Sequence, residues 1–301
     1  MTGYLHPAYS AALENIGTPR QLPGSSAWVL LRPIPRSRDK DAIGCYPLFT
    51  CRDWSRLRAD VDALAGDAVS LFLVMDPLGT YDISDLRLTF PDLCRPYKEH
   101  FIIDLSGHSP AALSTNHRRN LRRAQRLVQV EHAADPLVHA QEWFALYDHL
   151  VARHSVTGPA AFSRASLARQ LGVPGVSMFR AIHQGVTVGI NLWYAQKDAA
   201  YFHLGACNET GYATSAPFAL IQGAIDYFRG HVQRLSLGAG AGTWGDASDG
   251  LSRFKRGWAS STRTAWRCGR ILNRARYVAL ATEHGTPDSD YFPTYRAGES
   301  A

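Results

Sequence analysis

The sequence predicts a mixed α/β fold built around a central, mostly antiparallel sheet. Three observations favour this class. Strand-like and helix-like segments are interspersed along the 301 residues. An antiparallel meander is predicted over residues 176–205, where apolar runs are separated by the turns Gln184-Gly185 and Lys197-Asp198. Residues 215–228 then form a predicted helix that is apolar on nearly all sides, and such a helix is normally covered by a sheet.

The remaining elements follow from local residue patterns, and residues 1–26 are predicted to be irregular. Before residue 106, strands are predicted at 28–33, 46–51, 69–75 and 100–105, and a helix at 53–64. Beyond it, helices are predicted at 109–128, 136–154, 162–171, 248–257 and 271–283, and strands at 233–237 and 262–266. We therefore divide the chain into an N-terminal lobe (1–105), a second domain (106–285) and a flexible tail (286–301).

Composition limits the class of protein and its compartment. A hydrophobic fraction of 46% and an aromatic fraction of 11% indicate a folded core rather than disorder. The net charge of +6 favours acidic partners such as nucleotide cofactors, tRNA or phosphorylated substrates, although an ordinary basic surface has the same charge. The five cysteines show no C-x-x-C spacing, which is typical of a reducing compartment. Without a signal-peptide pattern or a long apolar run, we expect a cytoplasmic protein with no membrane partner.

Arginines gather on one face of the helix predicted around residues 116–128, where the sequence is NHRRNLRRAQRLV. At about 100° per residue, one face carries Arg118, Arg119, Arg122, Arg123 and Arg126. The opposite face carries Leu121, Ala124, Leu127 and Val128. Several guanidinium groups on one side can bind phosphates bidentately, and the alternative is a solvated helix face. No recognised DNA-binding module accompanies this helix, so we expect no DNA partner.

The entrance of the buried helix is a second candidate site. Ser215 is suited to cap this helix, and Pro217 fits its first turn. Main-chain N–H groups and the positive end of the helix dipole bind anions such as a pyrophosphate. Ser215 and Ala216 are therefore candidate donor-phosphate residues, and an ordinary capped helix is the alternative.

The third candidate is Lys255. Leu251, Phe254 and Trp258 are spaced i, i+3 and i+7, so we expect them to form a buried stripe. Lys255 lies beside that stripe, and we expect it to be exposed but held in place, where it can offset charge on a phosphate or an oxyanion. A plain surface lysine is the alternative. Asp249 is predicted to cap this helix.

Two of these segments carry a family resemblance. Residues 249–258, DGLSRFKRGW, resemble the motif D-x-L-x-x-F-K-x-G-F/W near the end of FemAB-like proteins and their GNAT-like relatives. Residues 114–124, STNHRRNLRRA, are similar to that family's helix motif S-x-x-x-R-x-x-I/L-R-K/R-A. Over residues 105–270, the order and spacing of these pieces, the meander and the buried helix agree with the family. The usual acetyl-CoA loop, Q/R-x-x-G-x-G/A, is replaced before Pro217 by GYATSA.

The resemblance implies a GNAT-like fold in two related lobes, of which the N-terminal one is reduced. It implies an acyltransferase that transfers an acyl or aminoacyl group to an amine, with Lys255 near substrate phosphate or transition-state charge. The donor would be an acyl-CoA or an aminoacyl-tRNA, bound as a co-substrate rather than as a tight cofactor. No metal is implied.

Three hypotheses about function follow. The chain is an N-acyltransferase that uses an acyl thioester, an aminoacyl-tRNA-dependent peptide-bond-forming enzyme, which the arginine face favours, or a non-catalytic RNA- or tRNA-binding protein. For either enzyme the acceptor is a small-molecule or peptide amine. The catalytic candidates are Lys255, His203 as a proton acceptor and Tyr201 as a weaker acid, although a packed strand histidine is the favoured explanation of His203. The candidates for donor or phosphate binding are Ser215, Ala216, Arg118, Arg119, Arg122 and Arg256.

Overall fold

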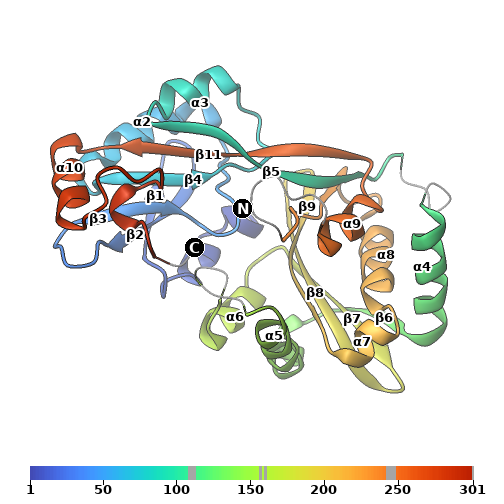
Figure 1. Ribbon diagram of the computed structural model, residues 1–301. Coiled ribbons are helices and arrows are strands. Elements are labelled where there is room, and N and C mark those ends of the chain that lie inside the picture. Colours follow the sequence, from blue (N-terminus) through green and yellow to red (C-terminus); the bar gives the residue numbers. More distant parts are fainter. Residues whose placement is uncertain (108–112, 156–157, 159–160, 242–248, 300–301) are drawn as a thin grey trace. The chain divides into compact units, whose positions relative to one another are not determined.

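A computed structural model describes residues 1–107, 113–155, 158, 161–241 and 249–299 (Figure 1). The chain forms two compact units. Unit 1 comprises Met1–Gly3, Lys98–Val156 and Ser163–Arg263, and unit 2 comprises Tyr4–Tyr97, Thr157–Phe162 and Thr264–Ala301. This division differs from the predicted one at residues 105 and 285, because the long strands β5 (Leu93–Asp104) and β11 (Ser261–Ile271) each begin in one unit and end in the other.

The sheet of unit 1 contains the predicted meander. Its strand order is β6-β7-β8-β9-β10-β5, and neighbours are antiparallel except for the parallel pair β9 and β10. Besides β5, its strands are β6 (Gln129–Ala133), β7 (Val176–His183), β8 (Val186–Gln196), β9 (Ala199–Cys207) and β10 (Arg234–Ser236). The meander over β7, β8 and β9 agrees with the prediction because its two turns are specified by local residues.

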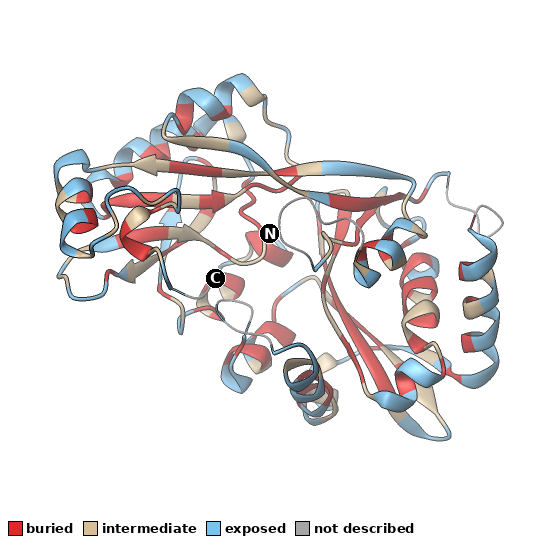
Figure 2. Cartoon of the chain, viewed as in Figure 1, coloured by how far each residue is buried: buried red, intermediate tan, exposed pale blue. Residues whose placement is uncertain are grey.

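Helices pack against this sheet as the apolar pattern predicted. They are α4 (Thr115–Leu127), α5 (Ala140–His154), α6 (Arg164–Leu171), α7 (Glu209–Ala213), α8 (Ala216–Phe228) and α9 (Gly250–Arg256), with a 3-10 turn η5 (Pro136–His139). Helix α8 buries Ile225 and Phe228 in one core with Phe179 and Trp193 of the sheet. Helix α4 is buried toward α8 and exposed along its other side (Figure 2).

Unit 2 has the strand order β1-β2-β3-β4-β11, again antiparallel except for the parallel pair β3 and β4. Its strands are β1 (Thr18–Leu22), β2 (Ala27–Pro33), β3 (Lys40–Gly44), β4 (Ser70–Val74) and the end of β11. Its helical segments are α1 (Pro7–Ala11), η2 (Trp54–Arg56), α2 (Leu57–Asp62), η3 (Ala63–Gly66), α3 (Ile83–Thr89), α10 (Arg274–Glu283) and η7 (Thr294–Arg296), and η1 (Gly3–Leu5) precedes them.

The two units are related lobes. Each has an antiparallel meander, then a helix, then a strand parallel to the last meander strand, and then an antiparallel neighbour. Unit 2, which contains most of the predicted N-terminal lobe, is the smaller version, because the six-residue α2 occupies the position that the 13-residue α8 has in unit 1. The predicted mixed α/β class, with a mostly antiparallel sheet in two lobes, is confirmed.

Several predicted elements of the N-terminal lobe were wrong. Residues 46–51 form no strand, and only Phe49 makes a bridge, to Met75. Pro47 has no N–H to donate to a ladder, and the paired strand is the more polar β3. The residues predicted to be an irregular lead-in contain α1 and β1, where Pro19 is tolerated because β1 lies at the edge of its sheet.

Differences in unit 1 and at the C-terminus concern element ends, one missed strand and one missed short helix. Helix α4 begins at Thr115, because the Ser114 hydroxyl accepts the His117 N–H (3.3 Å) and caps it. Ser109 and Pro110, the predicted start, lie outside the described residues, as does Ser248 of the predicted helix at 248–257. Strand β6 and the short helix α7 were not predicted, and α10 begins at Arg274 rather than residue 271.

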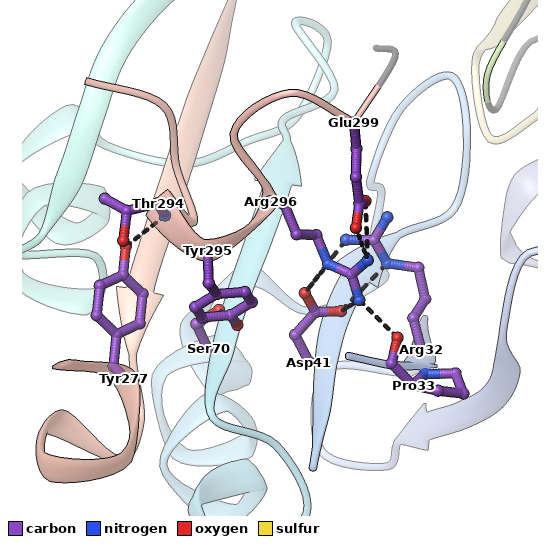
Figure 3. A network of polar contacts seen from close by, with 9 residues as sticks. All are labelled: Arg32, Pro33, Asp41, Ser70, Tyr277, Thr294, Tyr295, Arg296 and Glu299. Carbon is purple, nitrogen blue, oxygen red and sulfur yellow. Dashed lines mark hydrogen bonds and ion pairs between the residues drawn. The ribbon is translucent and has the colours of Figure 1, made fainter. Parts of the chain in front are cut away.

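The C-terminal segment is anchored rather than loose. The Arg296 guanidinium is buried and bonds to the Asp41 carboxylate, which also accepts from Arg32 (Figure 3). Arg296 donates as well to the Pro33 carbonyl (2.8 Å) and to Glu299 (2.9 Å). Asp41 is nearly inaccessible to solvent, and a buried carboxylate needs such partners. This network keeps the last described residues on unit 2.

Candidate active site

Aromatic rings hold three helices of unit 1 together. His117 of α4, Phe218 of α8 and Phe254 of α9 are in mutual contact, with centroids 5.2 Å apart for His117–Phe218 and 5.0 Å for Phe218–Phe254. Trp258, just after α9, lies 5.7 Å from the His117 ring. The His117 Nε2 is also 2.9 Å from the Phe254 carbonyl oxygen. The cluster therefore sets where the first turn of α8 and the whole of α9 lie relative to α4.

Gly257 makes this contact possible. A Cβ atom at this position would lie 2.0–2.5 Å from three atoms of the His117 ring, closer than any van der Waals contact. The glycine of the FemAB-like motif thus leaves the space into which His117 packs. Its function here is steric, because its backbone is not left-handed.

Lys255 projects from α9 into the interior. Its Nζ donates to the Ala239 carbonyl (2.6 Å) and lies 5.6 Å from the centroid of the Phe202 ring. Burial lowers the pKa of Lys255 to about 7, with a further decrease from Lys98 and an opposing increase from Asp249. The expectation that Lys255 is exposed was wrong, because its side chain is only 8% accessible.

The Lys255 ammonium lies where strands β9 and β10 part. Their parallel pairing covers Ala199, Ala200 and Tyr201 only, whereas β9 continues to Cys207. Beyond β10, Gly238 turns with a φ of +74°, and a Cβ there would be 3.4 Å from Lys255 Nζ. A cation is thus held between Phe202 of β9 and the main chain that follows β10.

His100 is a neighbour of this cation that sequence reasoning missed. Phe101, the next residue on β5, donates its N–H to the Gly238 carbonyl (3.1 Å), which places His100 beside the segment that Lys255 contacts. Burial and then the charges of Lys255 and Lys98 lower the pKa of His100 to about 3. Its Nδ1 is buried with no hydrogen-bond partner among the described residues. No spacing pattern marks this histidine, which begins a run of apolar strand residues.

The predicted cap of α9 is confirmed, and its predicted buried stripe is only partly right. The Asp249 carboxylate accepts the Ser252 N–H (2.9 Å), and this bonding with Ser252 lowers the Asp249 pKa. A Cβ on Gly240 would lie 1.9 Å from the Ser252 hydroxyl, so the segment after β10 packs on the first turn of α9. Leu251 is 40% exposed, and Trp258 is buried.

His203 and Tyr201 lie apart from Lys255. The His203 Nε2 is 2.7 Å from Gln170 Oε1 of α6, and burial lowers the His203 pKa to about 3. Alternate residues of a strand face opposite sides, so Tyr201 and His203 share one face of β9 while Phe202, beneath Lys255, is on the other. The structure does not bring the three predicted catalytic residues together, and their roles stay predictions.

The entrance of α8 differs in detail from the predicted cap. Ser215 occupies the cap position but has a left-handed φ of +62°, and its side chain makes no capping bond. The Ala216 methyl group is fully buried in the core. The Ala216 side chain therefore cannot face a ligand, whereas Ser215 is partly exposed. An acidic side chain at residue 216 would be forced into the core.

The arginine face of α4 is present as predicted, except that Leu127 joins it. A surface depression is lined by Thr115, Arg118, Arg119, Arg122, Arg123, Arg126 and Leu127. Within the described part of the chain, Arg119, Arg122, Arg123 and Arg126 form no ion pair, so the charges of these four guanidinium groups are not paired with acids. Arg256 is exposed on α9, with its guanidinium 5.7 Å from the Phe101 ring.

Among the described residues, no group of three or more His, Cys, Asp or Glu side chains is arranged to hold a metal ion. None of the helices in the described ranges has the length and apolar character needed to span a membrane.

Solved structures share this fold, although no protein-family model and no curated protein sequence matches the chain. A crystal structure of FemX superposes with a TM-score of 0.63 at 12% identity, over 84% of this chain and 86% of that one. The C-terminal domain of a putative lysylphosphatidylglycerol synthetase from Agrobacterium fabrum gives 0.61 at 16% identity, over 92% and 91%. L-PGS from Bacillus licheniformis gives 0.54 at 13% identity, over 94% and 97%.

These likenesses establish the fold. The chain has the fold of FemX and of the lysylphosphatidylglycerol synthetase C-terminal domain, in agreement with the FemAB-like resemblance predicted from residues 105–270. Both lobes take part, because each match covers more than four-fifths of the chain.

Proposed function

We propose that the protein is an N-acyltransferase that forms an amide between an activated acyl or aminoacyl donor and an amine. The observation that carries this proposal is the buried Lys255 ammonium at the parting of β9 and β10, within the fold that FemX shares. A buried lysine with a pKa near 7, beside a glycine-rich segment, is typical of a functional site rather than of a packing site.

The reaction needs two positioned substrates and a group that stabilises developing negative charge. The amine lone pair attacks the acyl carbonyl carbon, and the carbonyl electron pair moves to oxygen. The oxyanion then expels the leaving group, which departs with the proton that the amine loses. The protonated Lys255 is the cation that would face the oxyanion, and its low-dielectric surroundings strengthen that interaction. Its bond to Ala239 holds the ammonium in position before substrate arrives.

Within this proposal, an aminoacyl-tRNA is the donor that the charge distribution favours. The arginine face of α4 offers several exposed guanidinium groups without acidic partners, a surface suited to several successive phosphates. An acyl-CoA carries fewer phosphates and would not need so long a face. His117 of α4 contacts both α8 and α9. A donor bound along α4 would therefore extend toward α9, which carries Lys255.

Single-turnover assays of the wild-type protein and of Lys255→Met test the reaction. The purified protein would be offered a mixture of aminoacyl-tRNAs and, separately, a panel of acyl-CoAs with simple amines, and products would be detected by mass spectrometry. Lys255→Met should lower the rate roughly 100-fold or more, the scale of losing one charge-stabilising donor. A rate for Lys255→Met equal to that of the wild-type protein would show that Lys255 has no role in the reaction. Absence of any product with both donor classes would refute the proposal.

The donor class is tested by charge removal on α4. Replacing Arg118, Arg122 and Arg126 with Gln keeps helix propensity and removes three charges. For a tRNA donor, the slope of log affinity against log salt should decrease by about 0.7–0.9 for each phosphate that the helix no longer neutralises. The matched control replaces the exposed Arg20, Arg52 and Arg58 of unit 2 in the same way. Equal slopes in the two triple variants would show that α4 is a solvated helix face that does not bind the phosphates of the donor.

One alternative function is supported by a specific observation. The same arginine face would serve a non-catalytic tRNA-binding protein. In that case tRNA would bind with the same dependence on α4, but Lys255→Met would leave every measured property of the complex unchanged and no amide product would form.

A further inference from the structure

A groove on unit 1 lies away from the Lys255 cluster and has its own polar groups. It is bounded by the C-terminal half of α8, the edge strand β6, and Gln125 and Val128 at the end of α4, and it encloses about 340 Å³. That volume is within the range of small-molecule sites. We call it the α8–β6 groove. Gly223 of α8 keeps it open at its base, since a Cβ there would lie 2.7 Å from Val130 of β6.

One wall of the groove is aromatic. The rings of Tyr227 and His132 stack with centroids 4.1 Å apart and an interplanar angle of 25°. Phe179 supports both rings, 5.2 Å from His132 and 5.5 Å from Tyr227. His231 stacks on Tyr227 as well, with centroids 5.5 Å apart. The faces of the Tyr227 ring are therefore covered, and the wall offers the apolar edges of its rings to the body of a ligand.

The groove also holds an unsatisfied acceptor. Gln222 lines it, is only 6% accessible, and donates its Nε2 to Asp226 Oδ1 one helical turn away (2.8 Å). That bond fixes the orientation of the amide, because the opposite orientation would set two oxygens against each other. The Oε1 atom is thus an acceptor that is buried without a hydrogen-bond partner in the described chain. A buried acceptor is destabilising unless a ligand or water donates to it.

A negative charge stands beside this acceptor. The exposed Asp226 carboxylate forms no ion pair with any described residue. A ligand that suits both groups must donate hydrogen bonds and carry positive charge. An anion would be repelled, and a neutral apolar molecule would leave the Gln222 oxygen unsatisfied. A primary ammonium has three N–H donors and a positive charge, and it meets both needs.

We propose that the α8–β6 groove binds a small organic cation, a primary ammonium joined to a flat or apolar body. The ammonium donates to Gln222 Oε1 and to the Asp226 carboxylate, and the body lies along Tyr227 and His132. This site is independent of acyl transfer, since it uses none of the residues around Lys255.

Tyramine is a suitable probe, because it joins an ammonium to an aromatic ring, and 4-ethylphenol is the matched control without the charge. Both would be titrated into 15N-labelled protein by NMR at pH 7, where the amine is protonated. Tyramine should shift the signals of residues 222–227 saturably, and 4-ethylphenol should bind at least about tenfold more weakly, as expected for losing a charge-assisted hydrogen bond.

Two isosteric variants complete the test. Asp226→Asn keeps an oxygen for the Gln222 amide and removes the charge, and Gln222→Met removes the buried acceptor. Each should weaken tyramine binding about tenfold or more, whereas Glu209→Gln on α7, an exposed acid outside the groove, should not change it. Gln222→Met should not lower the melting temperature. Equal binding of the two probes, no saturable shift up to about 10 mM tyramine, or unchanged binding in Asp226→Asn would overturn the proposal.

Discussion

Replacing Lys255 with Met is expected to raise the stability of the protein at neutral pH, by an amount that depends on pH. Methionine is similarly long and unbranched, so it fills the same space without the charge. The pKa of Lys255 decreases from 10.5 to about 7 on folding, mainly because burial disfavours the ammonium. The unfolded chain thus binds one more proton than the folded chain between about pH 7 and pH 10.5. In that window the stability of the wild-type protein must rise with pH.

The magnitude follows from the same shift. A difference of 3.5 pKa units corresponds to about 4–5 kcal/mol at pH 7, at about 1.4 kcal/mol per unit. By pH 10 most of this penalty has gone, so the wild-type protein should gain about 3–4 kcal/mol relative to Lys255→Met between pH 7 and pH 10. The hydrogen bond that the neutral amine can donate to Ala239, worth about 0.5–1.5 kcal/mol, is lost in the variant at every pH and offsets part of its gain. The extra strength of the bond from the charged ammonium is already included in the pKa shift, so the slope is not altered.

The assay is urea denaturation of both proteins at several pH values from 6 to 10, with Lys40→Met, at an exposed lysine of β3, as the matched control. The difference curve for Lys40→Met should be flat. If the curve for Lys255→Met is flat as well, then Lys255 titrates as an exposed lysine does and the buried site described above is wrong. A catalytic consequence accompanies the shift: a step that needs the ammonium should slow as pH rises through about 7.

Three further outcomes are expected. Gly257→Ala should destabilise the protein by about 1–3 kcal/mol in thermal or urea unfolding, because its Cβ would overlap the His117 ring, whereas Gly250→Ala, with nothing within 4 Å, should not destabilise. Asp41→Asn should cost about 3–5 kcal/mol in urea unfolding, since it removes the buried carboxylate that pairs with Arg296 and leaves only the more exposed Glu299; a loss below about 1 kcal/mol would contradict the anchoring role. Because the folded-state pKa of His203 is near 3, below the unfolded value of 6.5, His203 should lower stability as pH falls from about 6 to 4. His203→Asn should remove about 1.4 kcal/mol per pH unit of that slope, and an unchanged slope would contradict the burial of this histidine.

Local patterns were enough to predict the central part of unit 1. The period-two runs and their turns determine β7, β8 and β9, and the all-round apolar character of residues 215–228 determines the buried helix α8. The arginine face of α4 and the Asp249 cap of α9 were also predictable, because residues three and four apart on a helix are neighbours whatever surrounds them. These features follow from interactions between residues close in sequence.

The surroundings of each side chain depended on the tertiary structure. Lys255 is buried because Ala239 and Phe202, distant in sequence, close around it, and His100 joins them only through the pairing of β5 with the segment after β10. The pairing of β3 and the anchoring of Arg296 on Asp41 likewise join residues that no local period connects. Burial and pKa are set by whatever packs around a group, so the sequence alone determined which residues could form a site, and strand pairing between distant segments decided which of them meet.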